Sequence, residues 1–202
     1  GIYNITFIAN DSSNNINSTQ TSNFTVNVGC SYLNINTNLG SDVSSSETCF
    51  TINASNIVLD CNGYTVNYGT TSTGVGVNNT HNTNNITIKN CNIKKNGVSG
   101  GFNYGINLFQ SVNGTIFNNS IMTNGSGGNS NLGIFFDLVN FTDIVNNSII
   151  TNGAGDSNYG ISLYLSNAIQ VLNNTIATGG VNQHGQVGIS VDGSNNTNIS
   201  NN

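Results

Sequence analysis

The sequence predicts an all-β fold, a parallel β-helix, because two markers repeat in one register. A Gly followed by an apolar residue recurs at spacings of 29, 28, 27 and 28, in Gly76-Val77, Gly105-Ile106, Gly133-Ile134, Gly160-Ile161 and Gly188-Ile189. An Asn-containing pair keeps the same step, in Asn90-Cys91, Asn118-Asn119, Asn146-Asn147, Asn173-Asn174 and Asn201-Asn202. Strong helix formers are scarce, and turn-forming Asn, Gly, Ser and Thr are abundant. The repeat therefore predicts stacked coils rather than a sandwich or a helical domain.

Each repeat predicts three short strands. Apolar residues alternate after the marker Gly (Ile106, Leu108), before the Asn pair (Ile116) and after it (Ile121). This period of two is typical of a strand with one buried face. Three such strands in about 28 residues form one coil of triangular section, and neighbouring coils stack about 4.8 Å apart.

The Asn pairs are predicted to make the bends between strands. Asn tolerates a positive φ and bonds to its own backbone, which suits a tight turn. Amides stacked from coil to coil can also hydrogen-bond as a ladder along the axis. We expect this structural ladder at Asn90, Asn118, Asn146, Asn173 and Asn201.

Two stretches carry a family resemblance. The stretch from Cys49 to Val66 (CFTINASNIVLDCNGYTV) resembles the opening coil of right-handed β-helix proteins of archaeal and some bacterial surfaces. The block from Asn85 to Ile93 (NITIKNCNI) resembles the repeat of pectin-lyase-like and NosD-like proteins. The resemblance covers roughly residues 30–202. It implies a right-handed β-helix over 49–202, with 29–48 as an N-terminal cap or linker. Copper handling by the NosD-like group does not carry over, because two His, one Met and no ligand cluster are present.

Residues 1–28 have a different pattern, typical of a β-hairpin. Two alternating stretches, Gly1 to Asp11 and Ser22 to Val28, flank a polar turn. They resemble the last hairpin of an immunoglobulin-like module, which needs about seven strands. The hairpin is therefore expected to be a remnant of such a module or a strand donor to a neighbour. At the other end, no capping segment follows Asn202, so the last coil is expected to be open.

The four cysteines favour two disulfides. Cys61 and Cys91 occupy matching turns of adjacent coils, and Cys30 and Cys49 flank the expected cap. Of the three possible pairings we favour Cys30–Cys49 with Cys61–Cys91; the alternative is four buried free thiols. Disulfides imply an oxidising compartment, and hence an extracellular or cell-surface protein.

The low charge of the chain excludes nucleic acid as a partner. Only 5% of the 202 residues are charged, and the net charge is -5 with three Lys and no Arg. Such a chain cannot neutralise a nucleic-acid backbone. No apolar run approaches the ~18 residues of a spanning helix, so no membrane span is expected.

Several N-x-S/T sequons are candidates for glycosylation on an exterior protein. They include Asn4, Asn17, Asn23, Asn53, Asn85, Asn113, Asn140 and Asn195.

The strongest candidates for an active site are the fourth residues after the last four marker glycines. These residues are Phe109, Asp137, Tyr164 and Asp192. The two carboxylates would lie two coils apart, about 9.6 Å, near the separation found in inverting glycosidases. Phe109 and Tyr164 could stack on sugars. The competing interpretation makes both acids ordinary surface residues, since no His, Arg or third acid aligns with them.

No cofactor or metal is expected. Asp156 in the loop from Asn152 to Asp156 could join a Ca²⁺ site, but isolated acids bind Ca²⁺ poorly. His81 and His184 fall in separate loops, and Tyr104 and Tyr159 suggest a stacked aromatic ladder.

These observations favour a structural or adhesive protein over an enzyme. We expect an extracellular β-helix, a subunit or segment of a cell-surface layer (an archaeal-type S-layer) or filament. It would associate head to tail with its own copies or bind other surface proteins or glycans. The alternative is a carbohydrate-binding or polysaccharide-degrading β-helix of the pectin-lyase-like kind.

Overall fold

The computed structural model describes residues 2–10, 12–13, 16–25, 29–79, 82–95, 101–125, 130–153, 157–180 and 185–202. In residues 2–10 and 17–25 it describes the backbone only. All regular elements of the described residues are strands, and they form three parallel sheets and one antiparallel pair. The predicted parallel β-helix with three strands per coil is confirmed.

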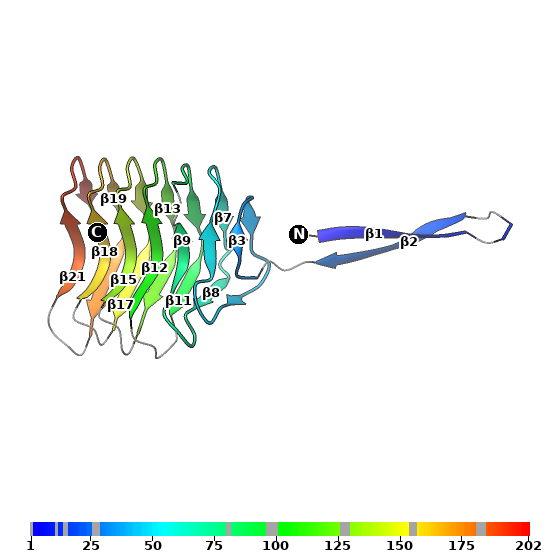
Figure 1. The fold of residues 1–202 in the computed structure, drawn as a ribbon, viewed down its shortest axis with the longest axis horizontal. Coiled ribbons are helices and arrows are strands. Elements are labelled where there is room, and N and C mark those ends of the chain that lie inside the picture. Colours follow the sequence, from blue (N-terminus) through cyan, green and yellow to red (C-terminus); the bar gives the residue numbers. More distant parts are fainter. Residues whose placement is uncertain are drawn as a thin grey trace.

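The chain passes through the three sheets in turn, once per coil, and successive coils lie side by side along one axis (Figure 1). The first sheet contains β3 (Tyr32–Leu33), β6 (Phe50–Ile52), β9 (Gly74–Asn79), β12 (Phe102–Phe109), β15 (Ser130–Asp137), β18 (Ser157–Tyr164) and β21 (Gln186–Asp192). The second contains β4 (Thr37–Asn38), β7 (Val58–Asp60), β10 (Thr87–Lys89), β13 (Thr115–Phe117), β16 (Asp143–Val145), β19 (Gln170–Leu172) and β22 (Asn198–Ser200). The third contains β5 (Val43–Ser44), β8 (Thr65–Tyr68), β11 (Asn92–Lys95), β14 (Ser120–Thr123), β17 (Ser148–Asn152) and β20 (Thr175–Gly179).

The register places like residues of successive coils opposite one another. Ile106 pairs with Ile134, which pairs with Ile161. All three are fully buried and fill the interior with the apolar residues of the other two sheets. Burying each such side chain contributes roughly 1.5–3 kcal/mol, so the alternating apolar positions of the repeat account for the core.

The marker Gly is required by the close approach of backbone and core. A Cβ on Gly133 would lie 2.3 Å from Cγ2 of Ile149 and 2.5 Å from the carbonyl oxygen of Gly160. Gly105 and Gly160 meet the same two obstacles in their own coils. No side chain therefore fits at this point of the strand.

The segment 29–48, expected as a cap or linker, contains β3, β4 and β5. These short strands pair with β6, β7 and β8, so the parallel sheets begin at Tyr32. A disulfide joins Cys30 to Cys49 across the start of the stack.

The N-terminal hairpin consists of β1 (Ile2–Asn10) and β2 (Ile16–Thr25), which pair antiparallel with Ile2 opposite Thr25. The second strand begins at Ile16, six residues before the expected Ser22. Cross-strand pairing with β1 extends the strand through Asn17 to Thr21, although these polar residues alone suggest a turn.

Candidate functional site

The four residues of the suggested active-site row lie together on the first sheet. Phe109 pairs with Asp137, Asp137 with Tyr164 and Tyr164 with Asp192. All four side chains are at least partly exposed on the outward face, at the ends of β12, β15, β18 and β21. The two carboxylates therefore stand two coils apart, about 9.6 Å by coil spacing, with the Tyr164 ring between them.

In the described part of the chain this row contains two carboxyl groups and no His, Lys or Arg. Partial burial raises the pKa of the Asp137 carboxyl above its usual range. Such a shift favours a proton donor. Phe109 and Tyr164 are its direct neighbours along the row, and Asp192, which could act as a general base, lies one coil beyond Tyr164. Chemically the row can accept hydrogen bonds from hydroxyl groups and stack on apolar ring faces.

The corner between the second and third sheets is built from the Asn pairs. The first residue of each pair has a positive φ of 54–56°, as expected for Asn90, Asn118, Asn146, Asn173 and Asn201. These side chains point outward, and a single bond joins two of them, from Asn118 Nδ2 to Asn90 Oδ1 at 2.8 Å. The left-handed bend is thus the main role of the first Asn.

The continuous hydrogen-bond ladder runs through the second residue of each pair, which the sequence did not single out for this role. The Asn147 side chain donates to the carbonyl oxygens of Ile116 (2.9 Å) and Val145 (3.1 Å). It also donates to Asn174 Oδ1 (3.0 Å). Its own Oδ1 accepts from the backbone N–H and the amide of Asn119. Asn119, Asn147 and Asn174 are each 2% exposed, so the ladder is internal.

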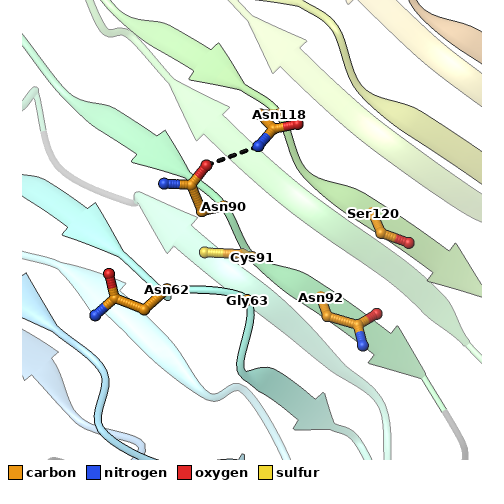
Figure 2. Close-up of a pocket in the computed structure, with 7 residues that line it drawn as sticks. All are labelled: Asn62, Gly63, Asn90, Cys91, Asn92, Asn118 and Ser120. Atoms are coloured by element: carbon orange, nitrogen blue, oxygen red, sulfur yellow. Dashed lines mark hydrogen bonds between the residues drawn. The ribbon is translucent and has the colours of Figure 1, made fainter.

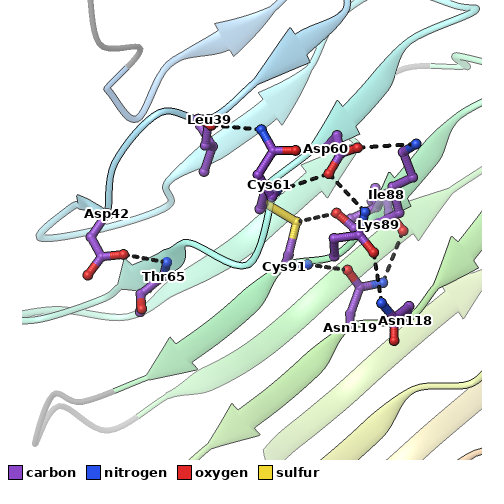
Figure 3. The surroundings of a disulfide bond; sticks show 12 residues. Leu39, Asp42, Asp60, Cys61, Thr65, Ile88, Lys89, Cys91, Asn118 and Asn119 are labelled. Atoms are coloured by element: carbon purple, nitrogen blue, oxygen red, sulfur yellow. Dashed lines mark hydrogen bonds and ion pairs between the residues drawn. A yellow bond between two sulfur atoms is a disulfide. The ribbon is translucent and has the colours of Figure 1, made fainter.

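A covalent bond continues the ladder at one end. Cys91 occupies the position equivalent to Asn119 in the preceding coil, and its N–H donates to Asn119 Oδ1 at 2.9 Å. Its sulfur bonds to Cys61 of the coil before that (Figure 3). With Cys30–Cys49, both predicted disulfides are confirmed.

Beside this disulfide lies an open hollow of about 490 Å³. Its lining is neutral: Asn62, Gly63, Asn90, Cys91, Asn92, Asn118 and Ser120 (Figure 2). It offers amides and a hydroxyl but no charged group, so it holds no set of residues for acid–base chemistry.

The ion pair next to the hollow is structural. Asp60 accepts from Lys89 Nζ at 3.1 Å, Asn90 Nδ2 at 3.0 Å and the Asn62 N–H at 2.9 Å (Figure 3). Burial alone would raise the pKa of this carboxyl, but the bonds it accepts outweigh that effect and lower the pKa. Asp60 thus ties the turn of one coil to the next coil.

Lys95 is fully buried inside the coils. Its ammonium donates to the carbonyl oxygens of Gly69 and Ser72, the latter at 2.7 Å. Desolvation lowers the pKa of this group. The bonded carbonyls belong to the turn of the preceding coil, so Lys95 stabilises that turn.

A second internal ladder, which the sequence alone did not indicate, lies on the first sheet. Asn103 Nδ2 donates to Asn131 Oδ1 at 3.0 Å, and Asn131 Nδ2 donates to Asn158 Oδ1 at 2.9 Å. All three are fully buried. Their spacing of 28 and 27 residues matches the repeat and was the available signal.

The sequons differ in how their amides are engaged. The amides of Asn53 and Asn85 donate to Asn34 (3.2 Å) and Asn56 (2.9 Å), and Asn140 accepts from Asn167. Asn113 and Asn195 are exposed. The side chains of Asn4, Asn17 and Asn23 lie outside the description.

Within the described ranges no group of three or more His, Cys, Asp or Glu could hold a metal ion. Asp156, His81 and His184 lie outside those ranges. The same part of the chain contains no helix long and apolar enough to cross a membrane.

No protein-family model, curated protein or solved structure matches this chain.

Proposed function

We propose that this chain is an extracellular structural or adhesive β-helix, a segment of a cell-surface layer or filament. The observation that carries the proposal is the unbroken row of coil-to-coil links at one corner. The Cys61–Cys91 disulfide and the buried amides from Asn119 to Asn174 join successive coils through side chains in addition to the backbone ladder. Such links stiffen a rod along its axis.

Two further features support a surface location. Disulfides persist in oxidising compartments, and this chain has no free cysteine. The near absence of charge also suits stacked coils, because like charges about 4.8 Å apart would repel one another along each row.

Localisation in the source cell tests this proposal. Antibodies raised against the chain should label the outer surface of intact cells in immunogold electron microscopy, and external protease should remove the label. Mass mapping without reductant should find both disulfides. Cytoplasmic labelling, or four free thiols in the freshly isolated protein, would overturn the proposal.

We further propose head-to-tail association, in which the edge strands of one copy extend the sheets of another. Light scattering should show a mass that grows with concentration. Val191→Lys, which places a charge in the inward row of β21, should suppress this growth. The matched control Ser190→Lys, on the outward face of β21, should not. A monodisperse monomer in the wild-type protein would refute the association.

A carbohydrate-active β-helix is the alternative, favoured by the joint exposure of Asp137, Tyr164 and Asp192 in one row. It predicts release of reducing sugar from a polysaccharide, with turnover abolished by Asp137→Asn or Asp192→Asn. Absence of turnover in the wild-type protein across neutral and anionic polysaccharides would remove the hydrolase.

A further inference from the structure

The outward face of the first sheet is unusually aromatic. Of the ten aromatic residues in 29–202 that are not buried, six lie on this face of three consecutive strands. They are Phe102, Tyr104 and Phe109 on β12, Phe135 on β15, and Tyr159 and Tyr164 on β18. We call these six residues the aromatic band.

The band is a surface rather than a part of the core. Phe102 is 61% exposed and Tyr164 42%. Tyr104 packs between two other rings, 6.2 Å from the Phe102 centroid and 5.4 Å from that of Phe135. Leu132 separates Tyr104 from Tyr159 along the row, so these two do not form the stacked pair suggested by the sequence. The rings instead group diagonally across β12 and β15.

The apolar surface continues past the strand ends, onto residues with a positive φ. Leu138 and Leu165 follow β15 and β18 with φ of 57° and 49°, a region that costs a bulky residue roughly 1–2 kcal/mol. Both are also exposed, at 37% and 40%. The equivalent residue of the next coil is Gly193, φ 58°, which adopts this conformation without strain. Gln110 makes the same bend after β12, with φ of 50°, so the bend itself recurs from coil to coil and the exposed Leu side chains are what extend the apolar surface.

The charged residues around the aromatic band limit the kind of ligand that it can bind. None of the three lysines faces the band: Lys89 pairs with Asp60 beside the second sheet, Lys94 lies on β11 of the third, and Lys95 is buried. Asp137 lies between Phe109 and Tyr164 of the band, and Asp192 follows Tyr164 on the next strand, β21. An anionic ligand would be repelled, and two copies joined through this face would bring their carboxylates together without a counter-charge.

We propose that the aromatic band binds a neutral glycan. Sugar rings combine an apolar face of C–H groups with an edge of hydroxyls. Tyr104, Phe135 and Tyr164 can stack on the former, and Asp137 with the half-buried amide of Asn107 can bond the latter. From Tyr104 to Phe109 the strand spans about 16 Å, enough for several sugar units. The inference rests on the adhesive part of the proposed function and names its ligand.

Binding is tested on the whole chain with an array of neutral oligosaccharides: β-linked glucans, mannans and N-acetylglucosamine oligomers. Polygalacturonate serves as the anionic probe. Because the chain has no Trp, tyrosine fluorescence can follow titration with any neutral oligosaccharide retained. Tyr104→Ala and Tyr164→Ala should each weaken binding about fivefold, since losing one stacked ring removes on the order of 1 kcal/mol.

The matched control is Tyr64→Ala, which removes a ring that is 38% exposed outside the band and should leave affinity unchanged. Circular dichroism should show the same strand content in all three variants.

Retention of no neutral glycan, preference for polygalacturonate, or an equal loss in Tyr64→Ala would overturn the proposal. A dimer dispersed by Tyr104→Ala would identify a second copy as the occupant and overturn it too. Surface labelling is measured separately. If the protein is found on the cell surface but binds no glycan, this inference is refuted and the proposed structural role is not.

Discussion

Replacing Asn147 by Ala should destabilise the coils more than replacing the exposed Asn146 beside it by Gly. The two amide hydrogens of Asn147 are shared among three acceptors, and its Oδ1 accepts two hydrogen bonds, at 2.9–3.1 Å. It is 2% exposed, so water cannot replace the lost partners. At about 1 kcal/mol for each bond, the expected loss is roughly 3–5 kcal/mol. For a chain of this size that corresponds to a fall in Tm of about 10 °C.

Urea denaturation followed by circular dichroism measures this loss. The matched control is Asn146→Gly, in the same turn. Asn146 is exposed and has φ 56°, a conformation that Gly adopts without steric cost, so its effect should stay within about 1 kcal/mol. The reasoning is refuted if Asn147→Ala falls within that range, or if both variants lose the same amount.

A near-isosteric change, Asn147→Asp, separates hydrogen bonding from packing. It keeps the acceptor but directs a second oxygen at Ile116 O, Val145 O and Asn174 Oδ1. Burial and these oxygens should raise the pKa of the new carboxyl in the folded state above the unfolded value of about 3.9. The loss relative to wild type should therefore be smallest below pH 4 and grow as the pH rises. A loss independent of pH between 3 and 7 would contradict this.

Three further predictions concern other parts of the coil. Gly133→Ala should lower the denaturation midpoint strongly, because its Cβ would meet Ile149 and the backbone of Gly160; Gly29→Ala, with nothing within 4 Å, should not. Asp60→Asn should lower the stability of the fold at pH 7 and leave it equal to wild type at low pH. The lowered pKa of Asp60 gives stability that is present above the unfolded pKa of about 3.9 and is lost as pH falls through the folded pKa. A constant difference in urea midpoint across pH 2–7 would argue against it. In a host that glycosylates sequons, mass mapping should find Asn113 occupied more often than Asn85, because the Asn85 amide donates to Asn56; equal occupancy would show that this bond does not matter.

The repeat alone predicted much of the fold. A constant step of about 28 residues fixes which strands become neighbours, so it determined the parallel sheets, the Ile106–Ile134–Ile161 row and the pairing of Cys61 with Cys91. It also aligned Asp137 with Tyr164 and Asp192 correctly. These are consequences of counting along the chain, because each coil repeats the path of the one before.

What counting could not decide is the direction in which each side chain points at a bend. Asn146 and Asn147 are adjacent residues of the same type. The left-handed φ of Asn146 directs its side chain outward, whereas the side chain of Asn147 points into the interior. The same uncertainty hid the burial of Lys95 and of the Asn103 ladder. Likewise, the sequence placed Tyr104 next to a marker Gly, but only diagonal packing between coils brought it to Phe135. The sequence determined the register by itself, and the tertiary structure decided the faces, because a side chain's surroundings depend on bends and on contacts between residues far apart along the chain.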